Sequence, residues 1–349
     1  MRTLSILAIP ALLLAFVGCA SAPPPPPPVD TAKVDPPSLP GYEAMPVPAD
    51  NPLTQAKIDL GRTLYYDKRL SADGTRACYT CHLKEKGLTD GLATAVGAFE
   101  AKLPRSSPTM WNIGFHSEFY WDGRAKALEA QVRAAWTGGN MGAGGKEKNR
   151  PSVDEIAAKI NALPGYGPPF QKAFGGPATP DNIVKAIACF VRTIVASNSA
   201  WIKFRGGDEN ALPEPARRGW KVFSEKAKCT NCHDGLLLTD QQYHNTGVGM
   251  DAEKPDVGRF TVTKTEKDTG AFKTPTLLDI SRSAPYFHNG SVATLEEAVD
   301  LMVNGGKKNK FLDTTNLKPA KLSKTEKDDL LAFLRALDVD YAVTEPAMP

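Results

Sequence analysis

Two short stretches, Cys78-Tyr79-Thr80-Cys81-His82 and Cys229-Thr230-Asn231-Cys232-His233, repeat one pattern in the two halves of the chain. In each stretch two residues separate the cysteines, and a histidine follows the second cysteine directly. This spacing suits two thioether bonds to the vinyl groups of one haem, with the histidine placed to coordinate the iron. The pattern predicts two covalently attached c-type haems, with His82 and His233 as their proximal iron ligands.

A zinc site is the alternative interpretation of the paired cysteines. Zinc would take the four thiolates as ligands and would leave both histidines without a role. A histidine in the same place in both stretches, in a chain that carries an export sequence, favours haem.

Residues 1–18 have the features of a bacterial export signal. Arg2 gives a positive start, and the apolar run at 4–17 is too short to span a membrane well. The sequence Phe16-Val17-Gly18-Cys19 resembles a lipobox, in which the signal is cut before a cysteine that becomes lipidated. We expect a lipoprotein signal and lipid on Cys19, with a plain signal peptide as the alternative. The expected location is the periplasm, tethered to a membrane, with the outer membrane favoured.

A proline-rich segment follows the signal. Residues 19–41 include an unbroken run from Pro23 to Pro28, which favours extended polyproline II over a packed core. We interpret this segment as the lipid anchor with a stiff spacer. With 349 residues, 42% of them hydrophobic, the chain is long enough for two domains. We place these at 42–205 and 206–349.

Apolar residues recur mainly at helical spacing, and few runs alternate as strands do. The expected helices are residues 128–136, 153–163, 181–197, 295–303 and 324–337. Similar sequences, Leu60-Gly61-Arg62 and Arg218-Gly219-Trp220, precede the two attachment stretches and form a weak internal repeat. The predicted fold is mainly α, with two cytochrome c-like domains, one haem in each, and long loops.

Composition limits the partners. The net charge of +3 is small for this length, and no basic run suggests a nucleic-acid groove, so nucleic acid is excluded as a partner. Cys189 is the one cysteine left after lipid and haem have been assigned, and its place in an apolar helical pattern predicts a buried, unreactive thiol.

Four further blocks resemble the bacterial dihaem cytochrome c peroxidases and their relative, the methylamine-utilisation dihaem oxidase. The resemblance covers about residues 50–340. The blocks are Arg105-Ser106-Ser107-Pro108-Thr109, Tyr120-Trp121-Asp122-Gly123-Arg124, Phe272-Lys273-Thr274-Pro275-Thr276-Leu277, and Ala284-Pro285-Tyr286-Phe287-His288-Asn289-Gly290 with Leu295-Glu296-Glu297-Ala298-Val299 after it.

The resemblance implies roles for single residues. Counting from Pro285 as in the family gives Met302 as the second ligand of the C-terminal haem, where a thioether raises the potential of an electron-accepting iron. A core position in a helix is the alternative for Met302. Trp121 corresponds to the tryptophan that relays electrons between the haems, with a plain buried indole as the alternative. Gln131 falls near the peroxide-reacting haem.

The family also binds calcium between its haems. By resemblance the ligands here would be Ser106, Ser283 and Pro285, the last two through backbone carbonyls. Ser106 stands where the family has Asn and offers a shorter oxygen ligand, so the resemblance implies a calcium site that is only partly retained.

Two departures from the family concern the N-terminal haem. Ala98 stands where many members have a second, removable His on the iron, so we expect an open site. Asn140 or Met141 stands where the family has a distal Glu, and neither can shuttle a proton as a carboxylate does. Glu147 could substitute if its loop folded inward, although a surface position is favoured.

Three histidines remain. For His116 a distal role stays open beside a solvent-facing or hydrogen-bonded one, which is favoured. His288 is expected beside the second haem without binding its iron. His244 has no assigned role.

Three hypotheses for function follow. The first is a peroxidase that takes electrons from a small periplasmic donor, such as a c-type cytochrome or a cupredoxin, and reduces hydrogen peroxide to water at the His82 haem. The second is a dihaem oxidase acting on a protein partner, and the third a non-enzymatic dihaem electron carrier. The family often forms dimers, which leaves a homodimer open.

Overall fold

The computed structural model describes residues 27–145, 149–340 and 344–349. The predicted export signal, Cys19 and Glu147 lie outside these residues. Among the described residues the chain is mainly helical with long loops, as predicted, and one short antiparallel ladder pairs β1 with β2. The helices are α1 (Gln55–Tyr66), α2 (Cys78–Cys81), α3 (Leu128–Thr137), α4 (Val153–Asn161), α5 (Gly167–Phe174), α6 (Pro180–Val191), α7 (Ala200–Arg205), α8 (Glu214–Lys221), α9 (Phe260–Thr263), α10 (Leu295–Val303) and α11 (Lys324–Arg335), and the strands are β1 (Tyr243–His244) and β2 (Phe272–Lys273).

The five predicted helices are confirmed as α3, α4, α6, α10 and α11. Helix α10 has the predicted bounds, and the other four differ at one or both ends. The largest difference is at α6, which stops at Val191 although its apolar pattern continues to residue 197. The hydroxyl of Thr193 donates a hydrogen bond of 2.6 Å to the carbonyl of Phe190. A side chain that bonds the backbone in this way competes with the helix, and the β-branched residues after it favour extended backbone.

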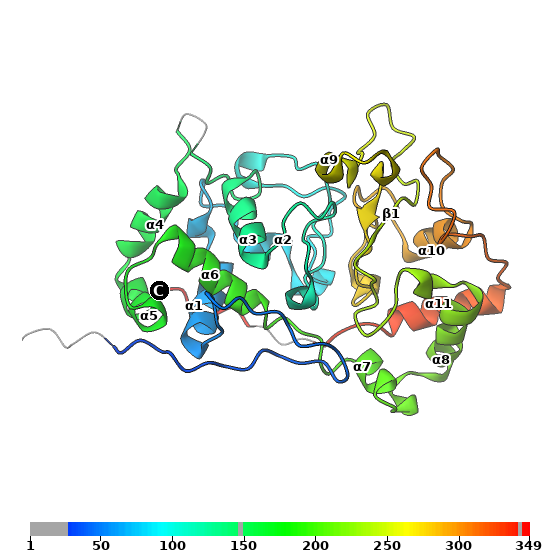
Figure 1. Ribbon diagram of the computed structural model, residues 1–349, viewed down its shortest axis with the longest axis horizontal. Helices are drawn as coiled ribbons and strands as arrows, with labels where there is room; N and C mark the ends of the chain where they lie inside the picture. The colour runs from blue at the N-terminus through cyan, green and yellow to red at the C-terminus, as the bar shows by residue number, and fades with distance from the viewer. Residues whose placement is uncertain (1–26, 146–148, 341–343) are drawn as a thin grey trace, which may run out of the picture.

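The weak internal repeat corresponds to two close helix crossings (Figure 1). Gly61 in α1 faces α6, and a Cβ atom at Gly61 would lie 1.9 Å from the backbone oxygen of Ala186. Gly219 in α8 faces α11, and a Cβ atom there would lie 1.9 Å from the backbone oxygen of Asp329. Each half therefore packs its lead-in helix against a later helix through a glycine that no larger residue can replace without moving the pair.

Polar caps fix where several helices begin. Ser152, Thr294 and Ser323 each accept a hydrogen bond from the backbone three residues on, and a Glu side chain at that position bonds back. Such a cap stabilises a helix start by about 1 kcal/mol. The cap at Thr294 fixes the start of α10, the helix that carries Met302.

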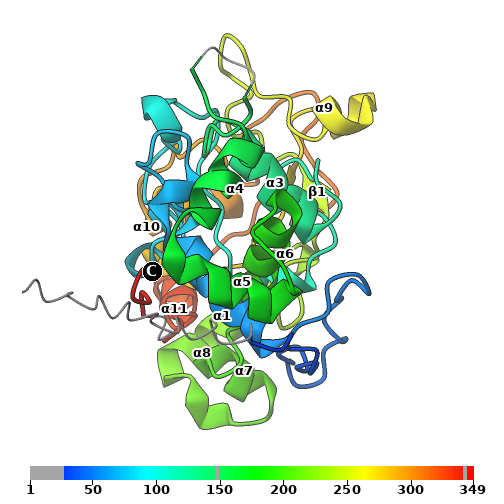
Figure 2. The same ribbon diagram turned by 90° about the vertical axis from the view of Figure 1, so that its left-hand side faces the viewer.

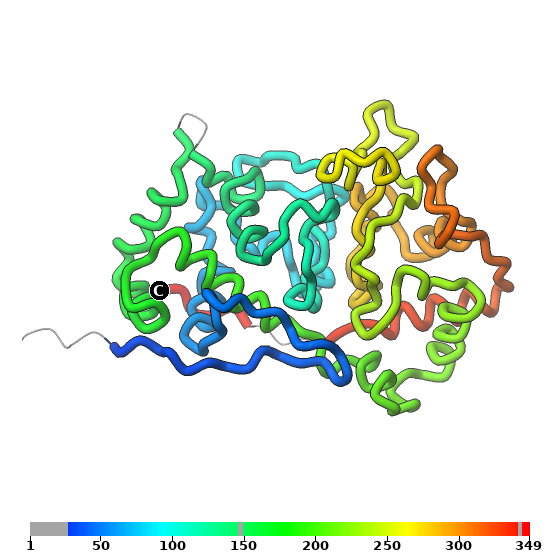
Figure 3. Tube along the Cα trace, viewed as in Figure 1, coloured from blue at the N-terminus to red at the C-terminus, as the bar shows by residue number. Residues whose placement is uncertain are grey.

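The described part of the proline-rich segment packs against the body of the molecule, which differs from the stiff spacer expected from the sequence. The Asp30 carboxylate accepts a hydrogen bond from the backbone of Ala56, and the backbone nitrogen of Val34 donates to the oxygen of Leu53. Leu39 is buried. Figure 3 shows this dark blue segment running along the lower edge of the molecule. The chain is therefore attached to the body of the molecule from Asp30 onward, and residues 30–41 are not a free spacer.

Long-range polar contacts join the two halves of the sequence. Arg105 binds Asp256 through two hydrogen bonds of 2.6 and 2.9 Å, and the indole of Trp111 donates to Asp279 at 2.7 Å. The C-terminal residues return to the first half, where Arg69 donates to the oxygen of Pro349. The turned view in Figure 2 shows the end of the chain close to α5. The two halves therefore form one packed body.

The helix before the predicted domain boundary packs with the second half. Trp201 in α7 is buried, with its ring centroid 5.0 Å from Trp220 and 5.6 Å from Phe333. Cys189 is also fully buried, as predicted. Within the described part of the chain, no helix combines the length and apolar character needed to cross a bilayer.

Candidate functional site: two cavities joined by a tryptophan

Each Cys-x-x-Cys-His stretch lines its own cavity. The first cavity measures about 450 Å³ and is lined by Cys78, Cys81 and His82 among others. The second measures about 220 Å³ and is lined by Cys229, Cys232 and His233. In both, the walls are mainly apolar side chains, which suits a large flat apolar cofactor.

Both histidines are prepared as iron ligands. The Nδ1 atom of His82 lies 3.0 Å from the carbonyl oxygen of Leu88, and that of His233 lies 3.0 Å from the carbonyl oxygen of Leu238. Burial lowers the pKa of both histidines, so each is neutral. A neutral ring that donates from Nδ1 to a carbonyl has its Nε2 lone pair free for a metal. The same arrangement at both sites fits two haem irons.

The thiols suit thioether bonds better than zinc binding. None of the four forms a disulfide. Burial raises the pKa of Cys78 and Cys229 to about 12 and that of Cys81 to about 11. Zinc needs thiolates, which such surroundings disfavour. The donor set therefore fits haem attachment, as the sequence predicted.

Trp121 lines both cavities. Its indole Nε1 donates a hydrogen bond of 3.0 Å to the carbonyl of Ser106, and its own carbonyl accepts one of 2.8 Å from the backbone nitrogen of Lys273. Backbone from both halves thus holds the indole in the wall between the two cavities. The alternative of an indole that serves only a core does not account for this position.

Similarity to known proteins agrees with this geometry. The sequence model described as "Di-haem cytochrome c peroxidase" matches residues 55–210. The chain is 37% identical to methylamine utilization protein MauG of Methylorubrum extorquens, over 88% of this chain and 85% of that protein. It is 34% identical to cytochrome-c peroxidase IdrP1 of a Pseudomonas species, over 91% and 90%. The chain belongs to the di-haem cytochrome c peroxidase family.

A solved structure supports the fold of this family member. The structure described as a MauG-like protein associated with microbial copper homeostasis is 34% identical, with a TM-score of 0.78, and the match covers 86% of this chain and 95% of that one. Relatives named as peroxidases and as MauG make this family member an oxidoreductase with two haems as its cofactors.

In this family member Met302 lines the second cavity together with His233. Leu295 and Val299, which precede it in α10, line the same cavity, so this face of the helix is the wall of the haem site. The helical spacing that favoured a core position is real, but the core it faces is the cofactor cavity. Met302 therefore lies in the wall of the same cavity as His233, and its role as the second ligand stays a prediction.

Gln131, Asn140 and Met141 all line the first cavity. Ala98 is buried, and its backbone nitrogen donates a hydrogen bond of 3.0 Å to the oxygen of Asn140. Close packing supports this contact, because a Cβ atom at Gly97 would lie 2.0 Å from the oxygen of Gly139. The two positions at which this chain departs from the family therefore lie side by side.

Two of the remaining histidines are now placed. His116 is buried, not solvent-facing, and its Nδ1 lies 2.7 Å from Nζ of Lys273, which confirms the hydrogen-bonded alternative. Burial, with the nearby Lys273 charge, holds the pKa of His116 well below its ordinary value. His288 lines the second cavity and stacks on Phe272 with ring centroids 3.6 Å apart, beside the second haem site as expected.

The three predicted calcium ligands lie in neighbouring segments. The backbone nitrogen of Ser106 donates to the oxygen of His288 at 2.7 Å, next to the block that contains Pro285. The hydroxyl of Ser106 donates to the carbonyl of Phe287 at 2.9 Å, and that of Ser283 donates to the carbonyl of Ile280 at 3.2 Å. The Ser106 side chain is thus engaged with protein, and calcium stays a prediction.

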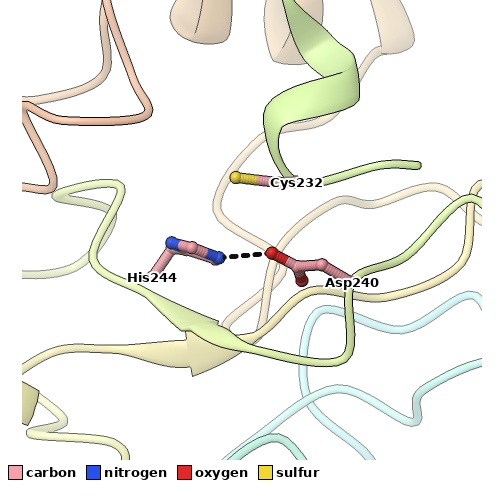
Figure 4. A group of neighbouring side chains, drawn as sticks. All are labelled: Cys232, Asp240 and His244. Atoms are coloured by element: carbon pink, nitrogen blue, oxygen red, sulfur yellow. Dashed lines mark hydrogen bonds and ion pairs between the residues drawn. The ribbon is translucent and has the colours of Figure 1, made fainter.

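The third histidine is part of a charged group that sequence reasoning missed. His244 lies between two carboxylates, with Nε2 2.8 Å from Asp240 and Nδ1 2.6 Å from Asp313 (Figure 4 shows the first contact, beside Cys232). Burial would lower the pKa of His244, but hydrogen bonding to Asp240, Cys232 and Asp313 outweighs it and raises the pKa to about 11. Cys232, Asp240 and His244 lie close enough together to hold a metal ion. A protonated His between the carboxylates of Asp240 and Asp313 is instead an ion-pair network.

Proposed function

We propose that the chain is a peroxidase that reduces hydrogen peroxide to water at the His82 cavity, with electrons that enter at the His233 cavity and pass by Trp121. The observation that carries this proposal is the position of Trp121 on both cavities. In this proposal Cys78 and Cys81 attach one haem, and Cys229 and Cys232 attach the other. When bound, the haems supply the iron redox chemistry.

The protein's part in the reaction is to hold the two haems and to present polar side chains to the peroxide. His82 and His233 present neutral Nε2 atoms, and Met302 presents a thioether that favours the reduced metal in the second cavity. Gln131 and Asn140 offer amide groups to a peroxide in the first cavity. An amide donates and accepts hydrogen bonds but does not release a proton, so the proton steps depend on water or on a group at the rim.

We also propose that the first site is open in the oxidised protein. Ala98 has no ligating atom, and His116 is engaged with Lys273 and not in the cavity wall. The electron paramagnetic resonance spectrum of the fully oxidised protein should contain one high-spin and one low-spin haem. Two low-spin haems would mean that another side chain caps the iron.

Steady-state consumption of peroxide tests the proposal. With a reduced small c-type cytochrome or cupredoxin as donor, two donor molecules should be oxidised for each peroxide removed. A protein that consumes peroxide without oxidising such a donor would contradict the proposed electron path.

An oxidase acting on a protein partner is the second candidate. It is favoured by the 37% identity to MauG and by the likeness to a MauG-like structure. In that case peroxide would be consumed while a partner protein, and not the small donor, is oxidised. The relatives' names favour either enzyme over a non-enzymatic carrier.

For the location we propose a periplasmic protein anchored to a membrane by lipid on Cys19. The lipobox-like sequence before Cys19 and the proline-rich residues after it support this. Replacing Cys19 with Ser should release the haem protein into the soluble periplasmic fraction, and a variant that stays with the membranes would refute the anchor.

A further inference from the structure

Three tyrosines form a continuous line from the first cavity toward the surface. Tyr65 in α1 is buried and lines the first cavity. Its ring centroid lies 5.2 Å from that of Tyr66, which lies 4.7 Å from that of Tyr79. Tyr79 is half-buried and belongs to the first attachment stretch. The line is separate from Trp121, which connects the first cavity to the second.

Contact between the rings makes this line a route for single electrons. A phenol is one of the few side chains that can lose one electron to a strong oxidant, and rings in contact keep each transfer short. Tyr120 and Trp136 also line the first cavity, but the ring contacts of the described residues do not continue from either one to a second tyrosine or tryptophan. The line of Tyr65, Tyr66 and Tyr79 begins at the cavity and continues through ring contacts to a half-buried residue.

Loss of the phenolic proton determines which tyrosine can remain as an oxidised radical. Burial raises the pKa of Tyr66 to about 12, with neighbouring Tyr79 and the carboxylates Glu345 and Glu85 acting in the same direction and Arg62 against them. Burial also raises the pKa of Tyr79, again with Glu85 and Glu345. Tyr66 and Tyr79 are therefore protonated at neutral pH. A phenol that loses an electron must also lose its proton, and Tyr79 is the most solvent-accessible member of the line.

We propose that Tyr65, Tyr66 and Tyr79 form a relay that carries an electron from the surface to the first cavity, so that Tyr79 is oxidised when the small donor is missing. This rests on the proposed peroxide reduction. In protein reduced beforehand by one electron, the second centre gives that electron and Tyr79 gives another with its phenolic proton. With one proton from solvent, the O–O bond breaks, two O–H bonds form, and the products are two waters and one tyrosyl radical.

Trapping the radical tests the relay. Holoprotein reduced by one electron is treated with equimolar hydrogen peroxide and the spin trap 2-methyl-2-nitrosopropane, then digested and analysed by mass spectrometry. The variants are Tyr79→Phe, Tyr66→Phe and Tyr65→Phe, which keep the packed ring and remove only the hydroxyl. Tyr42→Phe is the matched control, because Tyr42 is also half-buried in the first half but contacts Phe115 outside the line.

The expected result is trap on Tyr79 in the wild type and in Tyr42→Phe. Tyr66→Phe and Tyr65→Phe should reduce the label on the intact Tyr79 to background, and excess small donor should do the same. Unchanged labelling of Tyr79 in Tyr66→Phe would overturn the relay, and so would label on tryptophan instead of Tyr79. Peroxide consumption with the donor is measured in parallel. If the wild type consumes no peroxide, the proposed function is wrong. If it consumes peroxide but Tyr79 carries no label, only the relay is wrong.

Discussion

The backbone nitrogen of Lys273 in β2 donates a hydrogen bond of 2.8 Å to the carbonyl of Trp121. The side chain of the same lysine lies 2.7 Å from His116. One residue of the second half thus fixes the backbone of the bridging tryptophan and reaches back into the first half. The electron path proposed between the cavities depends on contacts of this kind, which join segments far apart in the sequence.

Replacing Trp121 with Phe should slow electron transfer between the haems and leave both haems bound. The variant loses the hydrogen bond to Ser106, which costs about 1 kcal/mol of stability, and it loses the indole that lines both cavities. Stopped-flow oxidation of the second haem by peroxide measures the effect. Trp136→Phe is the control, since Trp136 lines the first cavity only and its indole also bonds a carbonyl, that of Leu70. Equal rates in the two variants would contradict the relay role.

Asn140→Glu should raise the rate of peroxide turnover. A carboxylate in the first cavity could move a proton between the peroxide oxygens, and such acid–base help is typically worth about 10²- to 10⁴-fold. Asn140→Gln has the same length without a titratable group and serves as the control. If both variants have the same turnover, proton transfer at this position is not what limits the enzyme.

Met302→His should lower the reduction potential of the second haem, because the thioether favours ferrous iron more than an imidazole does. A redox titration followed by absorbance measures the potential, and the sulfur-to-iron charge-transfer band should disappear. Met250→Leu, in a loop outside the lining of the second cavity, should change neither property. Retention of the band in Met302→His would remove Met302 as a ligand.

Glu118, which binds Tyr243 and Arg259 of the second half, should make the stability of the fold depend on pH in the acidic range. Burial alone would raise its pKa, but hydrogen bonds from Lys126, Tyr243 and Arg259 outweigh this and lower the pKa from 4.5 to about 2. A carboxylate with a depressed pKa stabilises the fold above its unfolded value near 4.5, and this stabilisation is lost as the pH falls toward 2. Because the carboxylate is partly exposed to solvent, we expect a contribution of about 1 kcal/mol.

The measurement is the free energy of unfolding of the wild type and of Glu118→Gln as a function of pH. The variant should be less stable at pH 7, and the difference should shrink through the acidic range. Glu266→Gln, which removes a fully exposed partner of Lys310, is the control and should show almost no difference. A constant difference between the wild type and Glu118→Gln at all pH values would count against the assignment.

Local sequence patterns predicted the parts of the structure that depend on residues close together in the chain. The two Cys-x-x-Cys-His stretches predict both cavities, and the apolar spacing in 295–303 predicts α10 and with it the place of Met302. The sequence showed the repeated glycines, in Leu60-Gly61-Arg62 and Arg218-Gly219-Trp220. It did not show why glycine is needed there, which is the close crossing of two helices in each half.

Contacts between distant segments were not predictable in this way. His116 was left open because its partner, Lys273, is far along the chain and no spacing rule connects them. The same holds for His244, whose partners Asp240 and Asp313 come from two loops. Tyr65, Tyr66 and Tyr79 are close in sequence, but only packing shows that the first lines the cavity and that the last is half-buried.

The contact between Ala98 and Asn140 has a consequence for control of the enzyme. A site that must first release a ligand has an off state, because no turnover occurs until a loop moves. Here the corresponding loop is held against the cavity wall by a backbone hydrogen bond and by a glycine contact too tight for any side chain. If the proposed function is right, the cavity has no closed state that prevents turnover. Peroxide would be admitted whether or not electrons are available, and restraint over damaging oxidation would have to come from the supply of donor.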